Sequence, residues 1–247
     1  MKAISLPAWR IASARDFATK VAATFPECAR ALGKKGVLTG TPLRPELFRG
    51  SRAAGLALAG FDGQKPVLLM TGGSLGARHL NQAVAALKDE LLAYGDLHIV
   101  QVTGPKELDA VREQLALSPE QQARWQLLGY TDHMGDAMAA ADVVVSRAGA
   151  TSLAEISARA LPALLVPFPF ATEDHQTMNA QACVEAGAAY LVADADVEGP
   201  EFARKLRELI EDEDVRARMA AAARAQKTRD AAGLLADAVM EAARAQR

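Results

Sequence analysis

Residues 67–84 read VLLMTGGSLGARHLNQAV, and this stretch decides the fold. An uninterrupted apolar run leads into a glycine-rich turn, and the turn leads into a segment whose apolar residues recur at helical spacing. Apolar runs without alternation are typical of strands that helices cover on both faces of a parallel sheet. The stretch therefore predicts a buried strand, a tight turn and a helix, which form the first half of a βαβ unit.

The same pattern continues along the chain. From about residue 65 onward, short apolar runs alternate with helical stretches, and each run ends in small or turn-forming residues. The predicted fold is α/β, a Rossmann-like doubly wound parallel sheet with a helical C-terminal tail. Strands are expected near residues 67–70, 97–102, 125–128, 142–145, 163–167 and 190–192, and helices near 77–93, 106–114, 133–140, 151–159 and 176–186.

Three segments lie outside this pattern. Residues 1–36 offer an amphipathic helical pattern over 9–21 and a strand-like KVAATF, which is too little to close a core. The amphipathic pattern fits a helix packed on a domain and also a helix lying on a membrane surface. Residues 51–64 are expected to form a connector, and residues 201–247 two or three helices.

The composition limits the class of protein. The chain has 247 residues, 50% hydrophobic and 23% charged, which excludes a disordered chain. The formal net charge of −2 excludes a broad basic face for nucleic acid but leaves room for a local anion pocket. Cys28 and Cys183 are far apart and match no metal spacing, and no apolar run is long enough to span a bilayer. These features favour a cytoplasmic protein.

The turn after the first strand favours phosphate. Gly73 and its glycine neighbours let backbone N–H groups approach a ligand, and the following helix adds partial positive charge at its N-terminus. The turn has neither the Walker spacing nor the GxGxxG spacing. A turn that serves packing alone is the alternative.

A second strand, turn and helix lie in DVVVSRAGATSLAEISARALPALLVPF (142–168). Gly149 allows the turn, and Glu155 projects from the following helix, where its carboxylate could accept hydrogen bonds from a ribose diol. The alternative for Glu155 is a solvated surface side chain. Arg147 either meets a phosphate or pairs with an acidic residue.

A third loop and helix lie in PFPFATEDHQTMNAQACVEAGAA (167–189). Gln176 and Asn179 are three residues apart, so they share a helix face, and neutral amides suit sugar hydroxyls. Asp174 is expected to cap the helix, and His175 is an isolated candidate for a general base.

These candidates follow the carboxyl ends of strands, where open α/β sheets bind their ligands. A diphosphate at the glycine turn, a ribose at Glu155 and a sugar at Gln176 and Asn179 together describe a nucleotide-sugar. No cofactor motif or metal cluster competes. The acidic pair Asp194 and Asp196 could bind a divalent ion, but a solvated turn is favoured.

Three strings carry a resemblance to a known family: TGGSLGARHLN (71–81), GYTDHMGDAMAAADVVVSRAGATSLAEI (129–156) and LPALLVPFPFATEDHQTMNA (161–180). They resemble the MurG family, the UDP-N-acetylglucosamine:undecaprenyl-pyrophosphoryl-muramoyl-pentapeptide N-acetylglucosaminyltransferases. Residues 40–48 resemble its interdomain crossing, and residues 5–27 the end of its N-terminal domain. The resemblance implies the GT-B arrangement, in which two Rossmann-like domains face a cleft and the C-terminal one holds the donor.

The resemblance also implies residue roles. Arg44 and Ser74 would contact the diphosphate, the main chain of Thr131 the uracil, Glu155 the ribose, and Gln176 with Asn179 the GlcNAc. Leu75, Ala148 and Phe170 depart from the residues that are common in the family. The full set expected to bind UDP-GlcNAc is Arg44, Gly73, Ser74, Thr131, Arg147, Gly149, Glu155, Gln176 and Asn179.

The activity implied by the resemblance is an inverting, metal-independent transfer of GlcNAc to the lipid-linked muramoyl-pentapeptide of peptidoglycan synthesis, at the cytoplasmic face of the cell membrane. The family's catalytic base is expected in its N-terminal domain, which has no counterpart here. Residues 1–40 are expected to be a remnant of that domain with the crossover, 41–228 the UDP-GlcNAc-binding domain, and 229–247 a helix packing on the missing domain. Two alternatives are a non-catalytic donor-binding subunit that docks with a separate acceptor-domain chain, and a UDP-sugar epimerase of related fold.

Overall fold

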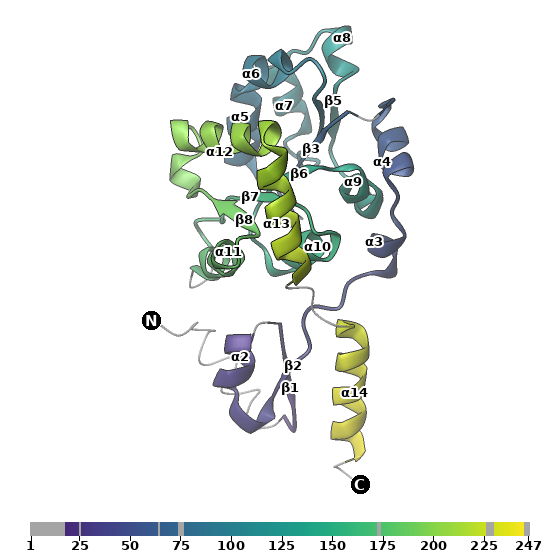
Figure 1. Cartoon of the computed structure of the whole chain (residues 1–247), viewed down its shortest axis with the longest axis vertical. Helices are drawn as coiled ribbons and strands as arrows, with labels where there is room; N and C mark the ends of the chain where they lie inside the picture. Colours follow the sequence, from purple (N-terminus) through teal and green to yellow (C-terminus); the bar gives the residue numbers. More distant parts are fainter. Residues whose placement is uncertain are drawn as a thin grey trace.

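The computed structural model describes residues 18–24, 26–63, 65–73, 77–171, 174–225 and 230–244. Most of the amphipathic pattern expected over residues 9–21 lies outside the described residues. Two sheets are present in the described part, one of six strands and one of two (Figure 1).

The six-stranded sheet is parallel throughout and confirms the predicted fold class. The strand order is β5-β4-β3-β6-β7-β8, which is the doubly wound order with its reversal between β3 and β6. The apolar runs of the sequence form these strands to within one or two residues at most ends. The strands are β3 (Val67–Thr71), β4 (His98–Val102), β5 (Trp125–Leu128), β6 (Val143–Ser146), β7 (Ala163–Leu165) and β8 (Ala189–Leu191).

Helices cover both faces of this sheet (Figure 1). Leu68 and Met70 point into one core, together with α5, α6, α7, α12 and α13, whereas Val67 and Leu69 point into the other, together with α3, α4, α9, α10 and α11. Burial on both faces explains why the strands lack polar alternation. The helices of this unit are α3 (Pro45–Arg49), α4 (Arg52–Ala59), α5 (Arg78–Ala86), α6 (Lys88–Ala93), α7 (Leu108–Leu115), α8 (Pro119–Gln122), α9 (Met134–Ala140), α10 (Ala150–Arg159), α11 (His175–Glu185), α12 (Pro200–Glu211) and α13 (Glu213–Ala225).

The connector expected over residues 51–64 is wrong in its first half, because α4 occupies it. The Ser51 side chain accepts a hydrogen bond from the Ala54 N–H at the start of α4, and Gly60 ends the helix at a φ of +69°. The single helix expected over 77–93 is also divided at Leu87 into α5 and α6. Local capping therefore sets elements that the apolar pattern did not resolve.

The end of α3 and the middle of α4 lie in backbone contact with α9. A Cβ atom on Gly50 would lie 2.1 Å from the Gly135 carbonyl oxygen, and one on Gly55 would lie 2.1 Å from the Asp136 carbonyl oxygen. Arg52 reinforces this contact with an ion pair to Asp142 at 3.1 Å. Only glycine fits at positions 50 and 55, so these two residues fix how closely α3 and α4 approach α9.

A small unit of two strands and one helix precedes α3 in the described part of the chain. It pairs β1 (Val21–Ala23) with β2 (Gly36–Leu38) in parallel and adds α2 (Pro26–Ala31) and a short 3-10 turn over residues 33–35. Its core consists of Ala23, Cys28 and Leu32, with two partly buried neighbours. The sequence expected strand character at 20–25 but gave no indication of β2.

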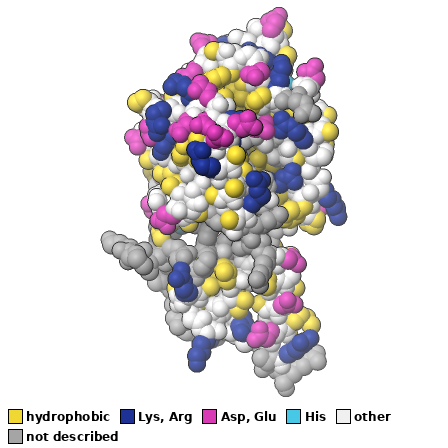
Figure 2. All heavy atoms as spheres, in the orientation of Figure 1, with side chains coloured by type: hydrophobic (Ala, Val, Ile, Leu, Met, Phe, Trp, Pro, Cys, Tyr) yellow, Lys and Arg dark blue, Asp and Glu magenta, His cyan; other side chains and the backbone are white. Residues whose placement is uncertain are grey.

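The last helix, α14 (Ala231–Arg244), lies beside this small unit rather than on the large sheet (Figure 1). Lys20 and Glu241 join the two by an ion pair of 3.1 Å. Leu38 on β2 and Val239 and Met240 on α14 are exposed, and apolar atoms are visible on this lower part of the molecule in Figure 2. The domain boundaries at residues 40 and 228 remain a prediction.

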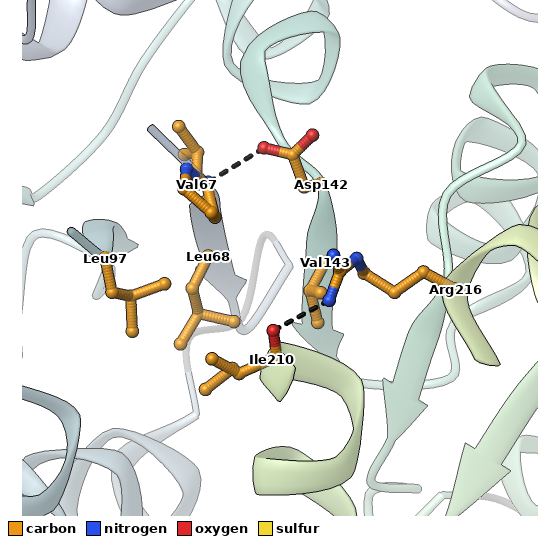
Figure 3. Close-up of a pocket in the computed structure, with 8 residues that line it drawn as sticks. Val67, Leu68, Leu97, Asp142, Val143, Ile210 and Arg216 are labelled. Carbon is orange, nitrogen blue, oxygen red and sulfur yellow. Dashed lines mark hydrogen bonds between the residues drawn. The ribbon is translucent and has the colours of Figure 1, made fainter. Parts of the chain in front are cut away.

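A hollow lies at the amino ends of β3, β4 and β6, where residues such as Val67, Leu97, Asp142 and Ile210 line it together with Arg216 (Figure 3). The Val67 N–H donates to Asp142, and Arg216 donates to the Ile210 carbonyl at 2.7 Å. A second hollow lies between α10, α11 and α13. The first lies at the edge opposite the carboxyl ends of the strands, where parallel sheets bind ligands, and the second lies between the sheet and its helices.

A buried polar network braces β4 and β5 against α5. Gln101, fully buried, accepts a hydrogen bond from the Trp125 indole N–H at 3.1 Å and donates to Asn81. Asn81 in turn donates to the Thr103 carbonyl at 2.9 Å. Removing the amide of Gln101 would leave buried donors and acceptors without partners.

We expect Gln101→Leu to lower the free energy of unfolding by about 2 kcal/mol, because the Trp125 N–H and the Asn81 amide lose their partner in the core. Urea denaturation followed by circular dichroism measures this change. Gln181→Leu, on the exposed face of α11, is the matched control and should change stability by less than about 0.5 kcal/mol. Equal stability of the two variants would contradict the role given to the network.

Candidate functional site

The candidate site lies at the carboxyl ends of β3 and β6, where the strand order reverses. Thr71 on β3 pairs with Ser146 on β6, so the two following turns start side by side. The helix after β3, α5, packs on one face of the sheet and the helix after β6, α10, on the other. Open α/β sheets usually bind their ligands between two such diverging turns.

The two glycine turns approach the same hydroxyl group. Gly73 has a φ of +72°, which a side chain would strain, and a Cβ atom placed on it would lie 3.7 Å from Ser152 Oγ. A Cβ atom on Gly149 would lie 3.9 Å from the same oxygen. Ser152, near the start of α10, was not among the predicted residues, although it follows the glycine turn by three positions. Ser74 lies outside the described residues.

Two helices begin at these turns without a side-chain cap. Gly149 is the N-cap of the ten-residue α10 and Ala77 that of the nine-residue α5, and neither makes a side-chain capping hydrogen bond. The first N–H groups of a helix have no intrahelical partner and carry partial positive charge. The sequence predicted this supply of donors at the turn after β3, and the turn after β6 adds a second supply. An anion is the ligand that such donors suit.

Glu155, on α10, lies within the electrostatic reach of Arg44. Glu155 is partly buried, and its carboxylate makes no hydrogen bond with another described residue. Burial raises the pKa of Glu155, while the positive charge of Arg44 works in the opposite direction. Arg159, one turn further along α10, donates to the Leu47 and Gly50 carbonyls and so holds the segment after Arg44. Glu155 is therefore not a fully solvated surface residue.

Gln176 and Asn179 both contact Ala148 in the turn after β6. The Gln176 oxygen accepts hydrogen bonds from the Ala148 N–H at 3.1 Å and the Phe168 N–H at 3.0 Å. Asn179 Nδ2 donates to the Ala148 carbonyl at 3.5 Å. Structural bonds thus use one end of each amide, and Nε2 of Gln176 and Oδ1 of Asn179 are the ends that a ligand would meet.

Asp174 does not cap α11 as the sequence suggested. It occupies the N-cap position with a φ of +53°, but its side chain accepts a hydrogen bond from the Thr177 hydroxyl at 2.6 Å instead of from a backbone N–H. The left-handed backbone turns the carboxylate away from the helix N–H groups. His175 is exposed at the first position of α11.

Thr131 lies in the loop after β5, at the same edge of the sheet. Its hydroxyl accepts a hydrogen bond from the His133 N–H at 3.0 Å, which shapes the loop before α9. Next to it, the side chain of Tyr130 is exposed. The backbone of Thr131 therefore lies at the carboxyl edge, as the sequence predicted for its strand.

Arg147 resolves the alternative that the sequence left open, because it pairs with an acidic residue. Its side chain is 6% exposed and Nη1 lies 2.5 Å from Asp194 Oδ1. Asp194 was expected in a solvated turn, but its side chain is only 13% exposed, because Arg147 and His79 both bind it. Asp196, its neighbour in the same turn, is exposed.

The described residues hold no group of three or more histidine, cysteine, aspartate or glutamate side chains placed to bind a metal ion. Within the same described ranges, no helix is long and apolar enough to cross a membrane. Charged side chains of both signs are intermixed on the face shown in Figure 2.

Residues 67–235 match the model of the glycosyltransferase family 28 C-terminal domain. The match covers more than half of the chain, and it spans all six strands of the sheet and helices α5 and α10, which follow the two glycine turns. The chain belongs to this family of glycosyltransferases.

Curated relatives narrow the likeness. The chain is 40% identical over 219 residues to the UDP-N-acetylglucosamine–N-acetylmuramyl-(pentapeptide) pyrophosphoryl-undecaprenol N-acetylglucosamine transferase of Desulfitobacterium hafniense, a match that covers 87% of this chain and 59% of the relative. The enzyme of the same name from Salinibacter ruber is 38% identical over 224 residues, covering 90% and 59%. The chain thus spans about three-fifths of the length of these relatives.

Solved structures agree. The crystal structure of Acinetobacter baumannii MurG matches with a TM-score of 0.72 and 27% identity, covering 93% of this chain and 63% of that one. A Staphylococcus aureus MnaA structure with UDP has a TM-score of 0.60 at 15% identity, a likeness that concerns the fold alone. The resemblance to the MurG family is confirmed.

We expect Glu155→Gln to raise the melting temperature by about 2 °C at pH 7.5, because the substitution removes a charge that burial disfavours. A raised pKa in the folded state means that protonation stabilises the fold, so this advantage should shrink as the pH falls towards 5. Scanning calorimetry across this pH range measures both effects.

Glu185→Gln is the control, since Glu185 is exposed on α11. It should leave the melting temperature unchanged at both ends of the range. A Glu155→Gln variant less stable than the parent at pH 7.5 would show that the carboxylate is held by favourable contacts instead.

Proposed function

We propose that this chain binds UDP-GlcNAc at the carboxyl edge of its sheet and forms the donor-binding half of a GlcNAc transferase. The observation that carries the proposal is the convergence of two uncapped helix N-termini with a half-buried carboxylate that has no hydrogen-bonding partner among the described residues. A diphosphate needs donors and a ribose diol needs an acceptor, and the site supplies both. The names of the relatives at 38–40% identity supply the sugar and the acceptor class.

The proposed placement follows the residue roles that the resemblance to the MurG family implies. The N–H groups of α5 and α10, with Gly73, Ser74 and Gly149, would bind the diphosphate. Arg44, at the start of α3, would add positive charge. Glu155 would accept hydrogen bonds from the ribose hydroxyls, and the backbone at Thr131 would meet the uracil. Gln176 Nε2 and Asn179 Oδ1 would meet the GlcNAc, because their other ends are bound to the turn at Ala148.

The proposed chemistry is an inverting displacement at the anomeric carbon of GlcNAc. The bond from this carbon to the diphosphate oxygen breaks as an acceptor hydroxyl attacks, and the leaving UDP carries the negative charge. Helix N–H groups aimed at the diphosphate stabilise that charge as it develops. The base that takes the acceptor's proton would come from an acceptor-binding part like the one that completes the longer relatives.

The proposed acceptor is the lipid-linked muramoyl-pentapeptide named for the relatives, so transfer would take place at the cytoplasmic face of the membrane. The exposed apolar residues Leu38, Val239 and Met240 support contact with an acceptor-binding part, either on the same polypeptide or on a separate chain. A UDP-sugar epimerase has only a likeness of fold in its favour, since a solved UDP-N-acetylglucosamine 2-epimerase matches at 15% identity.

Isothermal titration of the full chain with UDP-GlcNAc, without added metal, tests donor binding. We expect saturable binding that Glu155→Gln weakens by about tenfold, since a charge-assisted hydrogen bond is lost. Gly73→Ala should weaken it by a similar factor, because its backbone lies in the left-handed region at the phosphate turn. NADH should not bind, and Glu185→Gln should bind like the parent.

Binding of UDP-GlcNAc that is insensitive to both Glu155→Gln and Gly73→Ala would place the donor elsewhere. The absence of any UDP-GlcNAc binding by the folded chain would contradict the proposed function. Titration with UDP-GalNAc in parallel reports whether the amides of Gln176 and Asn179 distinguish the sugar.

A further inference from the structure

Asp194 connects two elements that are far apart in the sequence. It begins the short turn η3 (Asp194–Asp196) after β8, and its two oxygens bind different partners. Oδ1 accepts from Arg147 Nη1 at 2.5 Å, and Oδ2 lies 2.9 Å from His79 Nδ1. His79 also lies 3.6 Å from Glu198 Oε1 through its other ring nitrogen.

Arg147 needs this carboxylate because it is buried. Its Nη1 also donates to the Val166 and Pro167 carbonyls at 3.3 and 3.1 Å, and its guanidinium lies over the Phe168 ring at 5.7 Å. Without Asp194, a buried positive charge would have only neutral partners among these groups. Burial acts to raise the pKa of Asp194, but the hydrogen bonds from His79 and Arg147 outweigh it and hold the pKa below its usual range.

The partners of Asp194 lie at the starts of the two site helices. His79 is the second residue of α5, directly after the turn that contains Gly73. Arg147 is the first residue after β6, and it lies two residues before Gly149, the N-cap of α10. One carboxylate therefore links the first turn of α5 to the turn that begins α10.

This link matters for a ligand that both helices must reach. Hydrogen bonds to a diphosphate require donors at fixed distances and angles, and an anchor behind each turn limits their movement. Resting on the proposed donor site, we propose that Asp194 is a positioning residue that holds the starts of α5 and α10 at the spacing needed to grip the diphosphate of the nucleotide-sugar. Asp194 does not itself touch the ligand, and the uridine end of the site does not depend on it.

The test compares a ligand that contains the diphosphate with one that lacks it. Affinities of the full chain for UDP and for uridine are measured by ligand-observed NMR titration, for the parent, Asp194→Asn and His79→Ala. We expect Asp194→Asn to weaken UDP by about tenfold, the loss that follows when one charge-assisted hydrogen bond is misplaced. Uridine affinity should change by less than twofold. His79→Ala, which releases only α5, should weaken UDP in the same direction by a smaller factor.

Asp196→Asn, an exposed change in the same turn, is the matched control and should bind both ligands like the parent. Circular dichroism shows whether each variant folds, and His79→Ala keeps the test valid if Asp194→Asn does not, because His79 is a third exposed. Equal weakening of UDP and uridine, or unchanged UDP affinity in His79→Ala, would overturn the positioning role. Failure of the parent chain to bind UDP would instead contradict the proposed function, and this inference with it.

Discussion

The parallel pairing of β3 with β6 is the constraint on which the rest of the structure depends. It places Thr71 beside Ser146 and so starts two glycine turns at the same edge of the sheet. Because the following helices, α5 and α10, pack on opposite faces, the two turns diverge at this edge, where each helix presents its first N–H groups. A shift of one residue in this register would reverse the faces of Leu68 and Leu69 and move the turns apart at once.

The polar side chains of the candidate site also hold the fold together. Gln176 and Asn179 spend one end of each amide on the backbone of Ala148, which fixes the turn after β6. Glu155, in contrast, bears a desolvation penalty without a hydrogen-bonding partner among the described residues. A desolvated carboxylate without a hydrogen-bonding partner lowers the stability of the fold. This pattern is expected of residues that bind a ligand.

The sequence predicted what depends on local pattern and missed what depends on distant contacts. The buried strands and glycine turns were predictable, because apolar runs and glycines act within a few residues. Strand β2 was not predictable, because its three residues form a strand only by pairing with β1. The partners of Asp194, 47 and 115 residues away along the chain, have no local signature, and the clamp of Gln176 on Ala148 spans 28 residues. Helix α4 was missed because its RAAGLALA sequence presents small residues and little apolar bulk.

The contact of Gly50 and Gly55 with α9 limits the substitutions that this part of the chain tolerates. At Gly50 and Gly55 a single methyl group would overlap a carbonyl oxygen, so no neighbouring side chain can shrink to make room. Most core positions tolerate exchange of one apolar side chain for another, but a backbone contact allows no such compensation. Gly50 follows Arg44 by six residues, so positions that meet no ligand restrict substitution in the segment beside the proposed site.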